Sequence, residues 1–120
     1  MVDAAVTWEP WLSRAKATDF GHLLTDTSVT PGVVFDVLVA RKDFVLDHAK
    51  DVKAVVDAWN EAVAYFDNHR EEAIDLMARD IGAWLKDPKT FAVALDGVRY
   101  FGANENKAFF RHERKTGAAL

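Results

Sequence analysis

The sequence predicts an α/β fold in which a short parallel or mixed sheet occupies the N-terminal third and helices make up the C-terminal half. Two observations support this prediction. Apolar residues run continuously through residues 2–8 and 33–40, as in buried strands, whereas from Asp43 onward they recur every three or four residues, as on one helix face. The 120 residues are 50% hydrophobic and 28% charged, which is typical of one globular domain. We therefore expect a single domain over residues 1–120.

The first predicted strand, residues 2–8, leads directly into a short helix predicted at about residues 10–17. Pro10 suits the first turn of this helix, because the N–H group that proline lacks would be unpaired there anyway. Residues 22–25 form a weaker strand candidate. The polar residues 26–32 then predict a loop whose side chains bond to their own backbone. This loop is the best candidate for a hinge or linker.

Residues 33–40, with the sequence VVFDVLVA, predict the second full strand. Both alternate sets of side chains are apolar, and Asp36 is the only polar member. Such a strand requires cover on both of its faces. We expect Asp36 to be a paired structural carboxylate, because an unpaired buried charge is costly.

The C-terminal half carries apolar stripes that predict helices packed against one another. On the long first helix the stripe consists of Val52, Val55, Val56, Trp59, Val63 and Phe66. On the second helix it consists of Ile74, Met77, Ala78, Ile81 and Trp84 or Leu85. Asn68 and Glu71 have the spacing of a capping box for the second helix. Asp87 and Pro88 predict the start of a third helix that ends at Gly97. A last short helix carries Ala108, Phe109 and Phe110.

Charge and hydropathy argue against a nucleic-acid surface and against a membrane span. The formal net charge is −4 and the isoelectric point is about 5.5, whereas phosphate binding requires a clustered basic patch. The basic residues at the C-terminus suit the negative end of a helix dipole: Arg111, His112, Arg114 and Lys115. No stretch reaches the roughly 18 apolar residues of a membrane span, and we expect no signal peptide in this chain.

The sequence predicts no catalytic residue, no metal site and no cofactor. Cysteine is absent, which removes thiolate ligands and thiol nucleophiles. The four histidines are scattered, and only His69 with Glu72 has a helical ligand spacing. Ser13 and Ser28 have no histidine near them in sequence, and there is no glycine-rich phosphate loop.

Three segments in this order and spacing carry a resemblance to a known family: VDAAVTWEPW, VLVARKDF and DVKAVVDAWNEAVAYFDNHREEAIDLMA. Over about residues 2–110 the chain resembles the C-terminal portion of the substrate-binding proteins of nitrate/sulfonate/taurine-type ABC importers, a group that includes binding proteins for thiamin precursors. The resemblance implies a partial periplasmic-binding-protein type II fold, in which two lobes close on a ligand. Residues 1–32 would be a remnant of the second lobe and hinge crossing, and residues 33–120 the hinge strand and C-terminal helices of a truncated domain.

The resemblance also implies a function. We expect a non-catalytic solute-binding component, or fragment, of an ABC importer for a small nitrogen- or sulfur-containing compound, and we do not expect it to bind ligand alone. Its partners would be that small molecule and an ABC permease, and its location periplasmic or membrane-anchored extracellular. One alternative is a small helical protein-interaction module. Another is a fragment of a thiamin-pyrimidine-synthase-like enzyme, although that enzyme relies on a histidine of the first lobe.

Thr7, Trp8 and Glu9 are the candidate ligand-binding residues. They lie where a strand ends and a helix begins, which is where open α/β sheets bind ligands, and in the family this turn lines the cleft. Trp8 would supply an aromatic wall, Glu9 a hydrogen-bond acceptor and Thr7 a hydroxyl. The competing interpretation makes Trp8 a packed aromatic residue and Glu9 a helix cap. A carboxylate at a helix start opposes an anionic ligand and favours a neutral or cationic nitrogenous one.

The two predicted strands also predict self-association. Both are apolar on both faces, and strands with unpaired edges recruit other strands. The 25–32 crossing would allow a segment to swap onto a neighbouring copy. We therefore expect a homodimer or a domain-swapped assembly.

Overall fold

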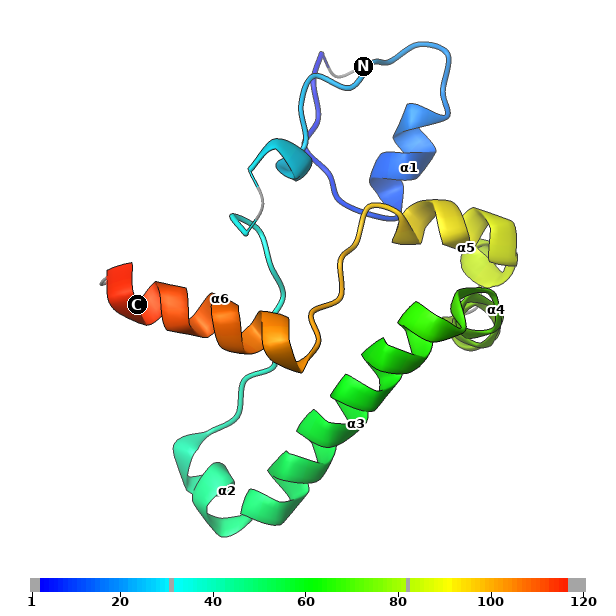
Figure 1. Cartoon of the computed structure of the whole chain (residues 1–120). Helices are drawn as coiled ribbons and strands as arrows, with labels where there is room; N and C mark the ends of the chain where they lie inside the picture. The colour runs from blue at the N-terminus through cyan, green and yellow to red at the C-terminus, as the bar shows by residue number, and fades with distance from the viewer. Residues whose placement is uncertain (1–2, 31, 82, 117–120) are drawn as a thin grey trace.

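The computed structural model of the chain describes residues 3–30, 32–81 and 83–116. Within these ranges every regular element is a helix (Figure 1). The elements in chain order are α1 (Trp11–Lys16), the 3₁₀ helix η1 (Thr27–Val29), α2 (Lys42–Asp47), α3 (Ala49–Asn68), α4 (Arg70–Ile81), the 3₁₀ helix η2 (Ala83–Lys86), α5 (Pro88–Leu95) and α6 (Ala103–Thr116). The short helix predicted at about residues 10–17 is confirmed by α1.

The predicted α/β fold is wrong, because the described residues contain no strand and no sheet. This also removes the partial periplasmic-binding-protein type II fold that rested on it. Residues 4–8, 22–25 and 35–41 have no regular secondary structure. A strand depends on hydrogen bonds to another strand, whereas a helix makes its bonds within about four residues. These apolar segments have no partner strand, so their side chains lie in solvent instead of in a sheet.

The hydrophobic core lies where α4 packs against α5, η2 and the end of α3. Among the described residues, the buried hydrophobic side chains are Val63, Ala73, Ile74, Ala78, Phe91, Ala94 and Leu95. Partly buried side chains surround the cluster that Ile74, Ala78, Phe91 and Leu95 form: Phe66, Met77, Leu85, Ala92 and Tyr100. The core therefore belongs entirely to the C-terminal half of the chain.

Only the C-terminal end of the apolar stripe on α3 reaches this core. Val63 is buried and Phe66 is half-buried, whereas Val55 and Val56 are exposed. The prediction of a buried helix face is therefore confirmed at the end of α3 and wrong for its first half. The physical reason is that α4 covers the end of the helix, whereas the first half packs on the short α2.

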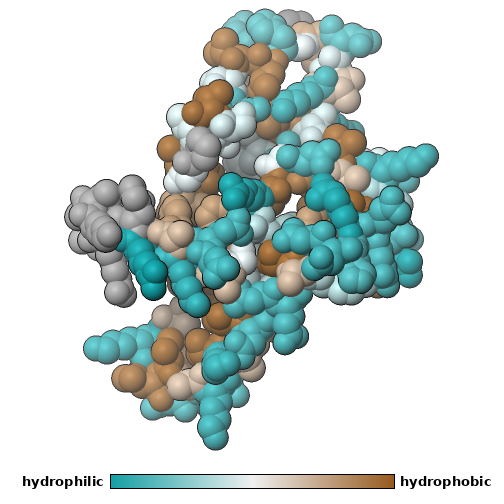
Figure 2. All heavy atoms as spheres, viewed as in Figure 1, coloured by the Kyte–Doolittle hydropathy of each residue, from teal (hydrophilic) through white to brown (hydrophobic). Residues whose placement is uncertain are grey.

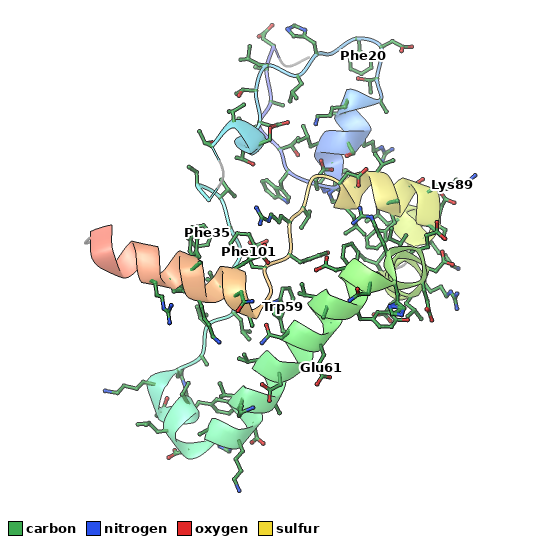
Figure 3. The ribbon with its side chains drawn as sticks, in the orientation of Figure 1. Phe20, Phe35, Trp59, Glu61, Lys89 and Phe101 are labelled. Atoms are coloured by element: carbon green, nitrogen blue, oxygen red, sulfur yellow. The ribbon has the colours of Figure 1, made fainter. Side chains whose placement is uncertain are left out.

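Trp59 lies at the boundary between the two halves of α3. Its side chain is 47% exposed, so its predicted burial is wrong as well. Its indole Nε1 donates a hydrogen bond to the carbonyl oxygen of Phe101 at 2.8 Å, and its ring meets the ring of Tyr100 edge-on. In Figure 3 Trp59 points from α3 toward the segment that carries Phe101. Trp59 thus joins α3 to the segment before α6.

The start of α5 follows its predicted cap. Oδ2 of Asp87 accepts hydrogen bonds from the backbone N–H and the hydroxyl of Thr90, each at 2.8 Å, and Pro88 is the first helical residue. The predicted capping box is wrong. Asn68 is the last residue of α3, and its Nδ2 donates to the carbonyl oxygen of Ala64 at 2.7 Å. The residue before α4 is His69, whose carbonyl oxygen accepts the N–H of Ala73 at 2.9 Å, so Asn68 does not occupy the N-cap position.

The molecule is open. Its radius of gyration is 17.5 Å, whereas a compact domain of this length has about 14 Å. In Figure 1 the N-terminal segments with α1 lie beside α5 at one end, and α2 lies at the other. Figure 2 shows hydrophobic side chains at the surface around both of these ends, whereas the side formed by α4 is mainly hydrophilic. Much apolar surface therefore remains in contact with water.

Candidate functional site

The predicted ligand-binding residues lie on a turn that leads into α1. The carbonyl oxygen of Trp8 accepts the N–H of Leu12 at 3.0 Å, and that of Pro10 accepts the N–H of Arg14 at 3.3 Å. Pro10 stands just before the first helical residue, and the Glu9–Pro10 peptide bond is cis. These local hydrogen bonds position Trp8 and Glu9 at the helix start.

The carboxylate of Glu9 is engaged within the protein. Its Oε2 accepts the backbone N–H of Ser13 at 3.1 Å, which satisfies one of the unpaired donors at the start of α1. Its side chain also lies against the backbone of Gly97, where an ideal Cβ would stand 2.7 Å from both Cγ and Oε1 of Glu9. Glu9 therefore caps α1 and holds the turn against the end of α5, as the helix-cap interpretation predicts.

Trp8 and Thr7 remain available to solvent. The Trp8 side chain is 74% exposed, and Thr7 is half-buried. Within the described part of the chain, neither side chain has a hydrogen bond, and Trp8 has no ring contact. The interpretation of Trp8 as a packed aromatic residue is thus not supported. Trp8 therefore presents a flat aromatic surface to solvent.

Two hollows lie in the helical part, and neither is lined by Thr7, Trp8 or Glu9. The larger, of about 420 Å³, is an apolar groove between α3 and α4. Its lining residues are Ala58, Glu61, Ala62, Tyr65, Phe66, Ala73, Leu76 and Met77. Figure 3 shows Glu61 on the outer side of α3. The structure therefore separates the predicted ligand residues from the two hollows.

The smaller hollow, of about 220 Å³, is polar and contains two arginines. Arg70 binds Oδ1 of Asp96 at 2.8 Å, and Arg99 binds Oε1 of Glu105 at 2.6 Å. Hydrogen bonds from the backbone N–H of Gly102 and from Arg99 lower the pKa of the Glu105 carboxyl. Burial raises the pKa of Tyr100. Sequence reasoning missed this cluster, because its members come from distant segments. Each guanidinium already has a carboxylate partner.

The polar loop bonds to its own backbone, as predicted. Oδ1 of Asp26 accepts the N–H of Ser28 at 3.0 Å and also its hydroxyl hydrogen. The bonds from Ser28 lower the pKa of Asp26, and Lys16 lies 3.6 Å from Oδ2. Asp36 is exposed, so the prediction of a paired, buried carboxylate there is wrong. The side chains of His112, Arg114 and Lys115 lie outside the described residues.

Neither a metal-ligating group nor a membrane-spanning helix occurs among the described residues. The described residues contain no group of three histidine, aspartate or glutamate side chains able to hold a metal ion. His69 instead stacks on the ring of Tyr65, with centroids 4.7 Å apart. No helix among them has the length and apolar character required to cross a membrane.

Comparison with known families now places the chain among the substrate-binding proteins of ABC transporters. Residues 1–82 match the NMT1-like family, the nitrate/sulfonate/taurine-type group. Since this is more than half of the chain, the protein belongs to the NMT1-like family, and the resemblance inferred from the sequence is confirmed. No curated protein and no solved structure matches the chain.

The matched residues include the Thr7–Glu9 turn and extend through α3 and α4. The family is non-enzymatic and typically periplasmic or extracellular. Its members have a small-molecule ligand and an ABC permease as partners.

Proposed function

We propose that the chain is a solute-binding component of an ABC importer and contributes the Thr7–Glu9 turn to the recognition of a small nitrogen-containing compound. The observation that carries the proposal is the family match over residues 1–82, which includes this turn. The exposed ring of Trp8 beside a helix start supports it. Catalysis is no part of the proposal, and the ABC permease is the protein partner.

The charge at the turn favours a neutral or cationic ligand over an anion. Free N–H groups at a helix start attract anions, but the Glu9 carboxylate already accepts the Ser13 N–H group. Its negative charge repels nitrate and sulfonates. The face of the Trp8 ring, in contrast, suits a cation or a flat heterocycle. A cationic or neutral nitrogenous compound, such as an aminopyrimidine, therefore fits this turn better than a sulfur oxyanion.

The turn is half of a site at most. Binding sites for small molecules commonly bury 70–90% of the ligand, whereas the Trp8 side chain is 74% exposed and lines neither of the two hollows. We therefore propose that the isolated chain binds its ligand no tighter than about millimolar, or about −4 kcal/mol.

The test follows the indole N–H signals of Trp8 and Trp11 by NMR during titration with an aminopyrimidine, taurine and nitrate. The aminopyrimidine should shift the Trp8 signal with a millimolar midpoint, and the anions should not. Trp11 on α1 is the internal control, and Trp8→Phe assigns the signal. If no compound shifts Trp8, or if nitrate alone does, the proposed site is wrong. A micromolar isotherm lost in Trp8→Ala would refute the claim that the chain is incompetent alone.

A small helical interaction module remains a second candidate, because the described elements are all helical and an open apolar groove lies between α3 and α4. A stable monomer of 13.4 kDa without strand content would favour it. Light scattering after size exclusion, combined with far-ultraviolet circular dichroism, distinguishes the two readings.

A further inference from the structure

Residues 35–41 form an extended, exposed segment between the Gly32 turn and α2. Their backbone N–H groups donate no hydrogen bond to any described residue, and only the carbonyl oxygen of Arg41 accepts one, from the N–H of Val45 at 3.0 Å. Val, Leu and Phe make up most of the segment, and β-branched residues favour extended structure. The segment thus has the composition and the free backbone groups of a strand edge.

The side chains of this segment are exposed on both faces. Val39 and Leu38, which point to opposite faces of an extended chain, are each 79% exposed. Val34, Phe35 and Val37 are exposed as well. Exposed apolar segments with free edges are pairing sites, and β-strand addition satisfies their backbone and covers their side chains together.

One face of the segment is already supported by α6. The rings of Phe35 and Phe109 meet edge-on with centroids 5.0 Å apart, and a Cβ on Gly32 would lie 3.6 Å from the Phe109 ring. Figure 3 shows Phe35 beside α6, near Phe101. A two-stranded ribbon is marginal in water by itself but gains stability when it packs on a helix. α6 supplies such support on the Phe35 face.

Charges flank the apolar part of the segment, and their arrangement favours a second copy of the chain as the partner. Asp36 lies within the segment, and Lys42, the first residue of α2, follows it directly. Both side chains are exposed, and neither has an ion pair with a described residue. In a two-fold antiparallel pair centred on Val39, residue 36 of one copy lies opposite residue 42 of the other, twice. The segment is therefore complementary to itself, with like residues at the centre and opposite charges at both ends.

We infer that two copies of the chain pair through residues 37–41 as an antiparallel ribbon with Val39 on the two-fold axis, flanked by Asp36 on one side and by Lys42, at the start of α2, on the other. Leu38 then lies opposite Ala40 of the other copy, and Val37 opposite Arg41. The ion pairs select this register, while the apolar side chains and backbone bonds hold the copies together. The pairing does not depend on the ligand proposed above.

Single-cysteine variants test the register, because the chain has no cysteine of its own. Directly opposed residues have Cα atoms about 4.5–5.5 Å apart, within the range of a disulfide, whereas diagonal neighbours are about 7–8 Å apart. Under mild oxidation Val39→Cys should cross-link to a dimer at least tenfold faster than Leu38→Cys, its equally exposed neighbour. A mixture of Leu38→Cys and Ala40→Cys should cross-link across the pair. Equal rates for the two single variants would overturn the proposal.

Light scattering tests the pairing without cross-linking. At tens of micromolar the chain should have twice the mass of 13.4 kDa. Asp36→Lys should raise the dissociation constant about tenfold by placing like charges opposite each other, and adding Lys42→Asp should restore pairing. Asp57→Lys on α3 is the control and should change nothing. A monomeric wild-type chain, or equal loss in Asp57→Lys, would refute the inference; circular dichroism confirms that each variant keeps its helices.

Discussion

The two halves of the molecule contain similar proportions of apolar residues but use them differently. In the C-terminal half, α4, α5 and the end of α3 bury a small core around Ile74 and Phe91. In residues 3–30 and 32–41, by contrast, no side chain is buried. The difference follows from the range of the hydrogen bonds, since helices complete theirs locally and can then pack, whereas extended segments need a distant partner first.

This contrast predicts that Phe91, in the helical half, contributes strongly to the free energy of unfolding, whereas Phe20, in the N-terminal half, contributes almost nothing. Phe91 is 5% exposed and Phe20 is 92% exposed. We expect Phe91→Ala to lower the free energy of unfolding by about 3–5 kcal/mol. The matched Phe20→Ala should change it by less than about 0.5 kcal/mol. Urea melts followed by circular dichroism measure both, and similar losses would show that the N-terminal half is packed after all.

Trp59 tests the boundary between the buried and exposed parts of α3. Because half of its ring is in water, Trp59→Ala should cost about 2 kcal/mol, less than Phe91→Ala. Trp59→Phe removes the hydrogen bond to Phe101 and should cost about 1 kcal/mol. The same urea melts provide the values. A loss as large as that of Phe91→Ala would place Trp59 in the core.

The contact of Glu9 with Gly97 joins the two halves of the molecule. The substitution Gly97→Ala should break this contact. A methyl group there displaces the flexible Glu9 side chain and with it the cap on Ser13. The cost is about 1 kcal/mol, which should speed hydrogen exchange of the Ser13 amide about fivefold. Glu9→Ala is the matched variant. In the Glu9→Ala background Gly97→Ala should have no further effect, and an additive result would mean that the two residues do not interact.

The smallest expected effect is on the pH dependence of stability, and it compares the carboxyl of Asp87 in the helical half with that of Asp26 in the N-terminal half. Hydrogen bonds from Thr90 lower the pKa of Asp87 below 3.8, as those from Ser28 do for Asp26. A carboxyl whose pKa is lowered by folding contributes stability at pH values above its unfolded pKa. This contribution is lost as the pH falls through its folded pKa. Asp87→Asn should therefore flatten the fall in helical stability below about pH 4.

Asp26→Asn should leave that slope unchanged, because the Asp26 bonds are local to a loop outside the helical core. Acid titrations of the urea midpoint distinguish the two carboxyls. An equal effect of both substitutions would indicate that loop and helices unfold together.

Local chemistry made several features predictable from the sequence. The cap formed by Asp87 and Pro88, the short helix α1 and the self-bonded Asp26 loop each depend on residues within about four positions of one another. Glu9 as a helix cap belongs to the same class. Family membership was also predictable, because the order and spacing of the segments that carry the resemblance are properties of the sequence.

What the sequence alone determined about this protein is therefore its helical segments, the cap at Asp87 and its family. Only the tertiary structure decided whether residues 4–8 and 33–40 found strand partners, which half of α3 was covered, and that Glu9 lies against Gly97. A continuous apolar run indicates that a segment needs cover on both faces, but it does not indicate which residues provide that cover. The reason is physical: sheet pairing, burial and side-chain contacts across the fold depend on residues that are distant in sequence.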